Sequence, residues 1–224
     1  MRAFVAISVL DDNSDLVEAI NRVIQSHVYT EIYVYDLTRK GLGSEMRRFI
    51  KSYNKFRVFS IRVKLAAKTE SRDERTNMGI AESLLLFNKM KSKGFESYVH
   101  INQGMIFSDG DLKSMTENSK IYHGISPVIE SCNGIEVLKA MFTRFDFEIM
   151  DLEGGSLHFI TGKIEDSFAL NPKCFALSTI CAHSLRIFTY SKDTPAVYLN
   201  SYIYKYSGKN PKVDTSVMVH EHLY

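Results

Sequence analysis

The sequence is poor in cysteine, and its cysteines are not spaced for pairing. Cys132, Cys174 and Cys181 form no Cys-x-x-Cys pair, and an odd number leaves one thiol without a partner. This pattern argues against a disulfide framework and is typical of reduced thiols in a cytosol-like compartment, so we expect a cytoplasmic protein. Each cysteine is best interpreted as a small, buried, apolar side chain.

Long apolar runs and an excess of charge of one sign are also missing. No stretch approaches the ~18 apolar residues that a membrane-spanning helix needs. The apolar part of the amino-terminal MRAFVAISVLDDNS is too short for a signal peptide. We therefore expect no transmembrane segment. The 28 basic residues nearly balance the 26 acidic ones, and no dense Lys/Arg run occurs, so we expect no nucleic-acid partner.

What the sequence does contain is apolar residues spaced with the periods of strands and helices. At 224 residues and 45% hydrophobic composition, it can bury the core of one large domain. In the first half, strand patterns alternate with amphipathic helix patterns, which predicts a doubly wound α/β sheet with helices on both faces. The segment 57–65 alternates as a half-exposed strand, near a sheet edge. The predicted strands are 2–10, 31–35, 57–65 and 97–107, and the predicted helices lie around 16–24, 44–53 and 77–93.

The second half alternates less cleanly, which predicts a mixed, partly antiparallel arrangement. Asn133-Gly134 is a strong turn signal that follows a predicted strand over 121–129. A short helix is expected over 112–118, and the apolar segment 168–185 is interpreted as helical after Pro172. Extended segments are expected over 157–161, 187–190 and 197–206.

Four segments of the first half, taken in order, resemble the inverting family-2 glycosyltransferases of the GT-A fold, which use nucleotide sugars. They are ISVLDDNSDLVEAINRVIQSH, EIYVYDLTRKG, SRDERTNMGIAESLLLF and SYVHINQGMIFSDGDLKSM. The resemblance covers residues 1–115. It implies a GT-A (Rossmann-like) doubly wound mixed sheet, with residues 1–115 as a nucleotide-sugar-binding half and residues 116–224 as an acceptor-binding half of one domain.

The resemblance also implies how the donor nucleotide is held. Asp11 would lie beside the base or ribose, and Asp36 would face the uracil or the ribose, because an acid beyond a parallel strand can accept hydrogen bonds from N–H and hydroxyl groups. Arg72 or Arg75 would approach the base or diphosphate, since a guanidinium is a forked donor suited to phosphate. Asn77 would shape the start of the following helix, whose free N–H groups favour anions.

The sequence departs from the family at the metal motif. The family's Asp-x-Asp triplet binds a divalent metal that bridges the diphosphate, but the equivalent triplet here is Asn102-Gln103-Gly104. Amide oxygens rarely hold Mg²⁺ or Mn²⁺ alone. Asp109 and Asp111 follow closely and are either a displaced metal site or turn and helix-cap residues.

Three interpretations of the altered triplet stay open. The protein could work without metal and use Arg or Lys against the diphosphate. It could bind Mn²⁺ or Mg²⁺ through Asp109, Asp111 and a histidine of His220-Glu221-His222. A strand places alternate residues on one face in any case, so the His-x-His pattern can also be incidental. It could also be a GT-A scaffold without transfer activity.

An inverting transfer needs a base that deprotonates the acceptor hydroxyl, and the second half offers acids for this role. Asp151 and Glu153 precede a glycine pair that suits an acceptor loop, and Asp166 belongs to an acidic pair of the kind such enzymes carry late in the domain. For each of them a solvated surface acid is the competing interpretation.

These observations favour a transferase that moves a sugar from a UDP- or GDP-linked donor to a glycan, lipid or protein acceptor. The alternative is a catalytically inactive GT-A-like binding module. A nucleotidyltransferase or methyltransferase ranks third, because the glycine-rich loop such enzymes carry after the first strand is missing from VLDDNSD.

Overall fold

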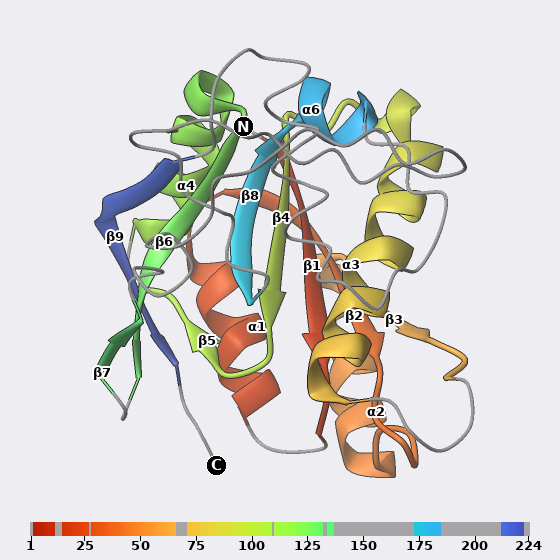
Figure 1. Ribbon diagram of the computed structural model, residues 1–224. Coiled ribbons are helices and arrows are strands. Elements are labelled where there is room, and N and C mark those ends of the chain that lie inside the picture. Colours follow the sequence, from red (N-terminus) through yellow and green to blue (C-terminus); the bar gives the residue numbers. More distant parts are fainter. Residues whose placement is uncertain are drawn as a thin grey trace, which may run out of the picture.

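The strands of the protein form one mixed sheet. The computed structural model describes residues 2–11, 15–26, 28–65, 71–108, 110–131, 134–136, 173–184 and 212–221. Nine strands share the sheet in the order β3-β2-β1-β4-β8-β6-β9-β5, and β7 pairs with β6 (Figure 1). The strands are β1 (Arg2–Val9), β2 (Tyr29–Asp36), β3 (Val58–Arg62), β4 (Ser97–Asn102), β5 (Met105–Ile106), β6 (Gly124–Ser131), β7 (Gly134–Glu136), β8 (Cys174–Ser178) and β9 (Lys212–Glu221).

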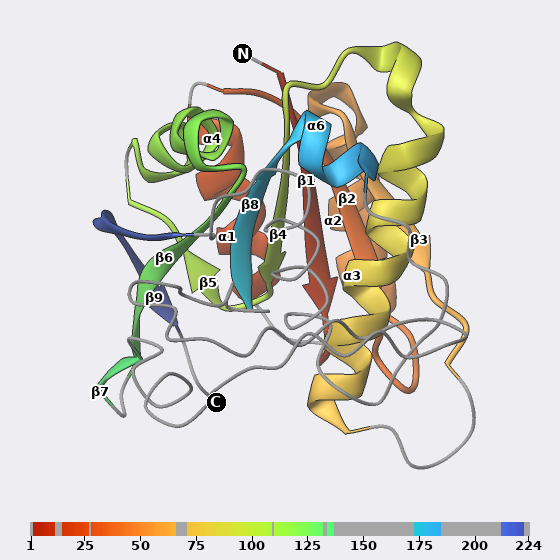
Figure 2. The same cartoon turned by 45° about the horizontal axis from the view of Figure 1, so that its top comes forward.

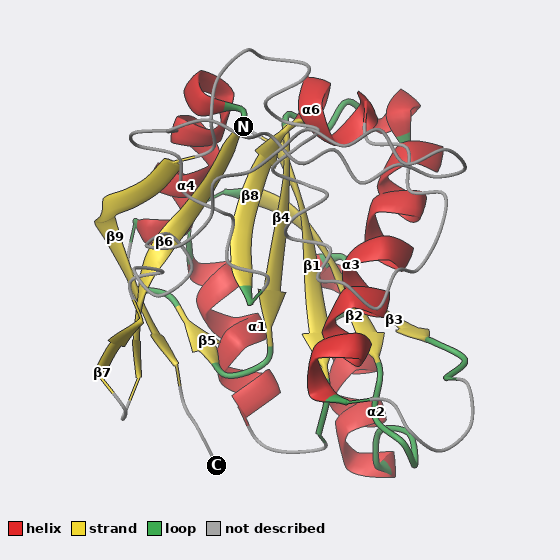
Figure 3. Ribbon diagram, viewed as in Figure 1, coloured by secondary structure: helices red, strands yellow, loops and turns green. Residues whose placement is uncertain are grey.

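Helices cover both faces of this sheet, as the sequence predicts (Figures 2 and 3). On one face α1, α2 and α4 pack on the odd-numbered side chains of β1, such as Val5 and Ile7. On the other face α3 and α6 cover Phe4 and Ala6. The helices are α1 (Asp15–Gln25), α2 (Ser44–Ser52), α3 (Arg72–Lys89), α4 (Asp111–Tyr122) and α6 (Thr179–Ser184), with 3₁₀ turns η1 (Asn54–Phe56) and η2 (Lys91–Lys93). Within the described residues, no helix combines the length and apolarity needed to cross a membrane.

The first four long strands run parallel, and β1 lies between β2 and β4. All of β1 after its first residue is buried, which explains why it reads as a continuous apolar run. The predicted position of β3 near an edge is confirmed, because β3 ends the strand order and Phe59 remains 38% exposed. The register aligns Val9 with Asp36 and Ser8 with Asn102, so the three strands end at one level.

Two predicted boundaries in the first half are wrong. Helix α3 begins at Arg72 rather than at Asn77, and the Arg75 amide already donates to Ser71 O at 3.2 Å. The strand predicted over 97–107 is broken after Asn102, where Gly104 adopts φ +85° and the chain turns into β5. Strand β5 then pairs antiparallel with β9 at the far end of the sheet.

The second half contributes strands to the same sheet, and its predicted mixed character is confirmed. The segment 168–185 is not one helix, because Cys174–Ser178 forms β8, antiparallel to both β4 and β6. Every residue of β8 is buried, and a short apolar run of this kind cannot be told from a buried helix by its periodicity. Residues 121–123, predicted as strand, belong to the end of α4 and the turn after it, and β6 begins at Gly124.

The turn predicted at Asn133-Gly134 is consistent with the antiparallel pairing of β6 and β7, in which Ser131 faces Gly134. The extended segments predicted over 157–161, 187–190 and 197–206 lie outside the described residues.

Candidate functional site

The ends of β1, β2 and β4 bring together the first-half residues that the sequence singles out. Asp11 follows β1, Asp36 ends β2, and Asn102 and Gln103 lie at the end of β4. Backbone hydrogen bonds continue past the strands, from Leu37 N to Val9 O and from Gln103 N to Ser8 O, at 2.9 and 2.8 Å. These residues therefore line one edge of the sheet, where ligands bind in open α/β folds.

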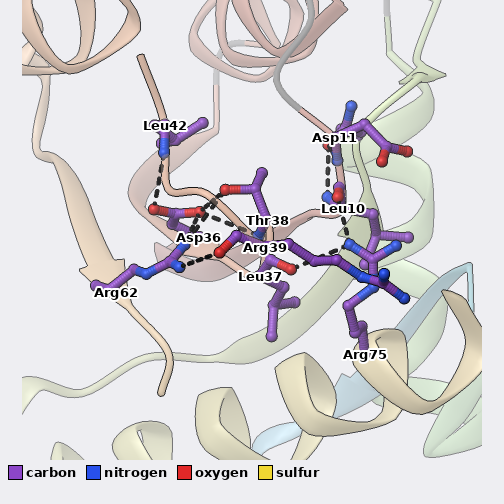
Figure 4. Close-up of polar contacts among 10 residues, drawn as sticks. Leu10, Asp11, Asp36, Leu37, Thr38, Arg39, Leu42, Arg62 and Arg75 are labelled. Atoms are coloured by element: carbon purple, nitrogen blue, oxygen red, sulfur yellow. Dashed lines mark hydrogen bonds and ion pairs between the residues drawn. The ribbon is translucent and has the colours of Figure 1, made fainter. Parts of the chain in front are cut away.

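Asp36 is held by donors from its own turn and from β3 (Figure 4). Its Oδ1 accepts hydrogen bonds from the Thr38 amide at 3.1 Å, the Thr38 hydroxyl at 2.6 Å and Arg62 Nη1 at 2.6 Å. Its Oδ2 accepts from the Leu42 amide at 3.1 Å. The carboxylate thus fixes the turn after β2, and its side chain is turned away from Asp11 in Figure 4.

Arg75 reaches back from the first turn of α3 to the ends of β1 and β2. Its Nη1 donates to Leu10 O at 2.5 Å and to Leu37 O at 3.2 Å. The residue is only 8% exposed, and its Nε has no hydrogen-bond partner in the described part of the chain. A guanidinium keeps its charge in proteins, so α3 places a buried cation with donor capacity to spare beside the strand ends.

The side-chain amides of Asn102 and Gln103 are oriented by their neighbours. Gln103 Oε1 accepts from the backbone amides of Leu10 at 2.6 Å and Asp11 at 3.0 Å. Because the carbonyl end is fixed, the Nε2 end is the free donor, and it finds no partner among the described residues. Asn102 Nδ2 donates to Thr76 Oγ1 at 3.2 Å, and Asn102 Oδ1 has no hydrogen-bond partner within the part of the chain that the structure describes.

Two further predicted residues lie at this edge with less defined roles. Asp11 and Arg72 form a loose ion pair at 3.9 Å, and the side chains are 56% and 51% exposed. Exposed pairs of this kind contribute little to stability, so both groups are available to a ligand. Asn77 lies inside α3 rather than at its start, so the anion-binding amides expected there belong to residues nearer Arg72.

The described residues do not fit a divalent-metal site. They contain no group of three or more His, Cys, Asp or Glu that could hold a metal ion. Asp36 and Gln103 present oxygens that already accept hydrogen bonds, and Asp111 Oδ2 accepts from the Ser108 amide at 2.8 Å. That contact supports the turn interpretation of Asp111, which begins α4; the N-cap of this helix is Gly110, and no side-chain cap hydrogen bond is present. Asp109, Asp151, Glu153, Asp166 and His222 lie outside the described residues.

Sequence reasoning missed a row of buried polar side chains on the face that α3 covers. Ser8, Tyr35 and Asn102 are aligned across the three strands by the sheet register, and Ser8 Oγ and Tyr35 OH lack hydrogen-bond partners in the described regions. The alternation of apolar and polar residues that would reveal such a row is hidden, because these strands are buried on both faces.

His100 belongs to the same face of β4 as Asn102, two residues before it. It is fully buried and stacks on Phe175 with ring centroids 5.4 Å apart. Burial lowers the pKa of His100 to about 3. The Asn102 amide opposes this fall in pKa, but neither ring nitrogen reaches hydrogen-bonding geometry with a described partner. The imidazole is therefore neutral near pH 7.

Known proteins resemble this chain in structure but not detectably in sequence. No protein-family model matches the chain, and no curated protein does. S. aureus TarS 1–349 in complex with UDP superposes with a TM-score of 0.62 at 12% identity, over 100% of this chain and 61% of that one. PcManGT, a mannosyltransferase from Pyrobaculum calidifontis in complex with GDP-Man and Mn²⁺, superposes with a TM-score of 0.56 at 10% identity. The match covers 97% of this chain and 56% of PcManGT.

The fold is GT-A-like. A Bacillus anthracis structure named as a glucose-1-phosphate thymidylyltransferase, in complex with a sucrose, also superposes, with a TM-score of 0.50 at 12% identity over 97% of this chain and 89% of that one. The likeness thus includes structures named as a mannosyltransferase and a thymidylyltransferase, and it shows a GT-A-like, Rossmann-like α/β fold. The chain spans less than two thirds of the length of TarS 1–349 and of PcManGT.

Proposed function

We propose that the protein is a glycosyltransferase that moves a sugar from a UDP- or GDP-linked donor to a glycan, lipid or protein acceptor. The observation that carries the proposal is the placement of Arg75, a buried cation with a free donor at the carboxyl ends of β1 and β2. The GT-A-like fold supports it, because TarS has been crystallised with UDP-GlcNAc and PcManGT with GDP-Man.

In this proposal, hydrogen-bond donors of the protein bind the diphosphate of the donor nucleotide. Arg75 and Gln103 both contact the Leu10–Asp11 backbone. Arg75 Nη1 donates to Leu10 O, and Gln103 Oε1 accepts from the Leu10 and Asp11 amides, which leaves Gln103 Nε2 as the donor for phosphate. Charge-assisted hydrogen bonds from such groups suit phosphate oxygens. Asp11 is exposed at the same strand end and accepts from the ribose hydroxyls, while Asp36 keeps the neighbouring turn in place.

Nucleotide binding tests the proposal directly. Isothermal titration with UDP, GDP and uridine is run in Mn²⁺ and again in EDTA. We expect UDP or GDP to bind more tightly than the nucleoside. Arg75→Met should weaken diphosphate binding roughly 10- to 100-fold, the effect of losing one charge-assisted hydrogen bond, and should leave uridine binding nearly unchanged. Arg22→Met, at an exposed ion pair on α1, is the matched control.

The outcome that contradicts the proposal is the absence of binding to either diphosphate under both conditions. The melting temperatures of both variants show whether Arg75→Met weakens binding by destabilising the fold.

A second candidate function is a nucleotide-binding module without transfer activity. It is favoured by the amide triplet, because Asn102 and Gln103 offer no carboxylate where the family carries its metal ligands. Hydrolysis or transfer from UDP-linked sugars separates the two functions. Turnover that is lost in Asp151→Asn, Glu153→Gln or Asp166→Asn would support the transferase and identify its base, whereas tight binding without turnover would support the module.

A further inference from the structure

The charge of the chain is strongly divided. Residues 39–64 contain nine of the 28 basic residues and one of the 26 acidic residues, Glu45. This segment therefore carries a net charge of +8 in a chain of net charge +2, and the remainder carries −6. Such a division creates a local potential that the overall charge conceals, and potentials of this kind attract anionic partners.

The fold gathers these charges on one edge of the molecule. All nine basic side chains are exposed, and they lie on the turn after β2, on α2, on η1 and on β3, the last strand of the sheet (Figure 1). We call this surface the basic edge. It comprises Arg39, Lys40, Arg47, Arg48, Lys51, Lys55, Arg57, Arg62 and Lys64.

Only part of this charge is balanced by acids. Arg57 pairs with Glu31 at 3.1 Å and Arg62 with Asp36 at 2.6 Å. In the described part of the chain, the α2 cations Arg47, Arg48 and Lys51 pair with no acid. The apolar face of α2 packs on the sheet through Ile50 and its neighbours, so these cations project from a fixed support.

Exposed aromatic side chains accompany the charges. Tyr29 is 48% exposed, Phe56 43% and Phe59 38%. Their ring faces are already used: Tyr29 lies under Arg2 and Arg57, with guanidinium carbons 5.5 and 4.5 Å from the ring centroid. The Lys55 ammonium lies 5.0 Å from the Phe56 ring centroid, and Phe59 stacks on Tyr33 at 5.2 Å.

We propose that the basic edge docks the protein on an anionic phospholipid surface. Nucleic-acid bases would need open aromatic faces on which to stack, and the rings here are covered by cations or by other rings. A lipid interface needs only apolar edges and the methylene stems of Lys and Arg, whose charged ends stay among the headgroups. Phe56, between Lys55 and Arg57 at the tip of η1, has this composition.

The charge is sufficient for reversible attachment. Each Lys or Arg at an anionic membrane surface contributes about 1 kcal/mol, and the contribution is screened by salt. Arg62 also links the edge to the candidate site, because it holds Asp36 at the end of β2. Because the basic edge runs from η1, before β3, to Arg62, at the carboxyl end of β3, docking would lay β3 along the headgroup region, with the carboxyl end of β2 next to it.

Vesicle flotation tests this inference with the full chain. Vesicles of phosphatidylcholine alone are compared with vesicles that also contain phosphatidylglycerol in equal parts. We expect binding only to the anionic vesicles, with a steep loss at high salt. The triple variant Arg47→Glu, Arg48→Glu, Lys51→Glu should lower the partition constant by roughly a hundredfold or more. Phe56→Ser should lower the partition constant without changing how strongly that constant depends on salt.

The matched control carries the same charge change on other exposed surfaces, Lys89→Glu, Lys91→Glu, Lys113→Glu. It should bind vesicles within about twofold of the parent if the basic edge is the docking surface. Equal losses in the two triple variants would overturn the inference, since net charge alone would then explain binding. Absence of binding to anionic vesicles would also overturn it, as would tight binding to single-stranded DNA or heparin together with no effect of Phe56→Ser.

Discussion

His100 is a titratable side chain that the fold keeps entirely out of water. A buried imidazole destabilises the folded state little while it is neutral, because only protonation would place an unpaired charge in the core. Glu31 is the opposite case. Burial alone would raise its pKa, but hydrogen bonds from Lys93, Tyr33 and Arg2 hold the pKa at about 2. Both residues make the folded state sensitive to acid, over different pH ranges.

For His100 the folded-state pKa of about 3 lies below the ordinary 6.5. The unfolded chain therefore binds the proton first, and stability that is complete above pH 6.5 is lost as the pH falls toward 3. We expect this loss to reach about 4 kcal/mol, measured by urea unfolding at a series of pH values. His100→Phe should flatten the slope between pH 6.5 and 4.5. His123→Asn should leave this slope unchanged. An equally steep slope in both variants would contradict the assignment of the pH dependence to His100.

Below pH 4.5 the Glu31 contribution is lost as well, because this carboxylate must be protonated as the pH falls from 4.5 through about 2. Glu31→Gln should remove this second part of the acid transition and should also lower stability at pH 7, where it leaves Arg2 and Lys93 without their partner.

Helix α3 approaches the sheet closely at Gly79, and this contact sets the position of Arg75. A Cβ on Gly79 would lie 2.1 Å from Ser8 Oγ and 2.8 Å from Leu37 Cδ1. Either the Ser8 and Leu37 side chains or the helix itself would have to shift to admit it. Since Arg75 lies one turn earlier on the same helix and spans the ends of β1 and β2, the close approach at Gly79 keeps its guanidinium within reach of both strands.

Gly79→Ala should therefore destabilise the protein, although alanine favours helices by about 1 kcal/mol over glycine. We expect the free energy of unfolding to fall by about 1–3 kcal/mol, the usual cost of overpacking, and nucleotide affinity to fall with it. Leu85→Ala, at a 40% exposed position on α3, is the control and should change neither quantity much. Ser8→Gly added to Gly79→Ala should restore part of the loss, and a neutral or stabilising Gly79→Ala would contradict this account.

The elements of the first half could be predicted well, and those of the second half only in part. Strand β1 follows from a continuous run of apolar residues, and helices α1 and α2 follow from apolar periodicity, which their packing preserves. Strand β8 could not be recognised, since all five residues are buried and its neighbours β4 and β6 come from distant parts of the sequence. At the candidate site, Asp36 and Arg75 could be predicted as residues, but their contacts depend on Arg62 and Leu10, which lie far from them in the sequence.

At the scale of the whole molecule, the two halves of the sequence share one sheet. Strand β8 pairs with β4, and β9 lies between β6 and β5, so the first half is completed by strands from the second. Phe175 and Leu177 belong to the same core cluster as Phe4 and Leu84. The division at residue 115 is therefore proposed as a functional boundary rather than a folding boundary.

A fragment of residues 1–115 should not fold cooperatively, because β4 would keep β1 but lose β8, and would become an exposed apolar edge. Circular dichroism melting and size-exclusion chromatography of the fragment should show a broad transition and association. The full chain is the control, and addition of the separate 116–224 fragment should restore part of the cooperativity. A sharp, monomeric transition in the isolated fragment would contradict the shared core.

The left-handed backbone of Gly104 has a consequence for redesign of the site. Asn102→Asp alone would add one acid to the tip of β4, but a full Asp-x-Asp triplet also requires Gly104→Asp, at φ +85°. Residues with a side chain pay for that conformation, so the second acid would tend to reshape the link to β5. A cation-binding tip here would thus require a new turn as well as new carboxylates, because the main chain at Gly104 follows a path that disfavours an acidic side chain.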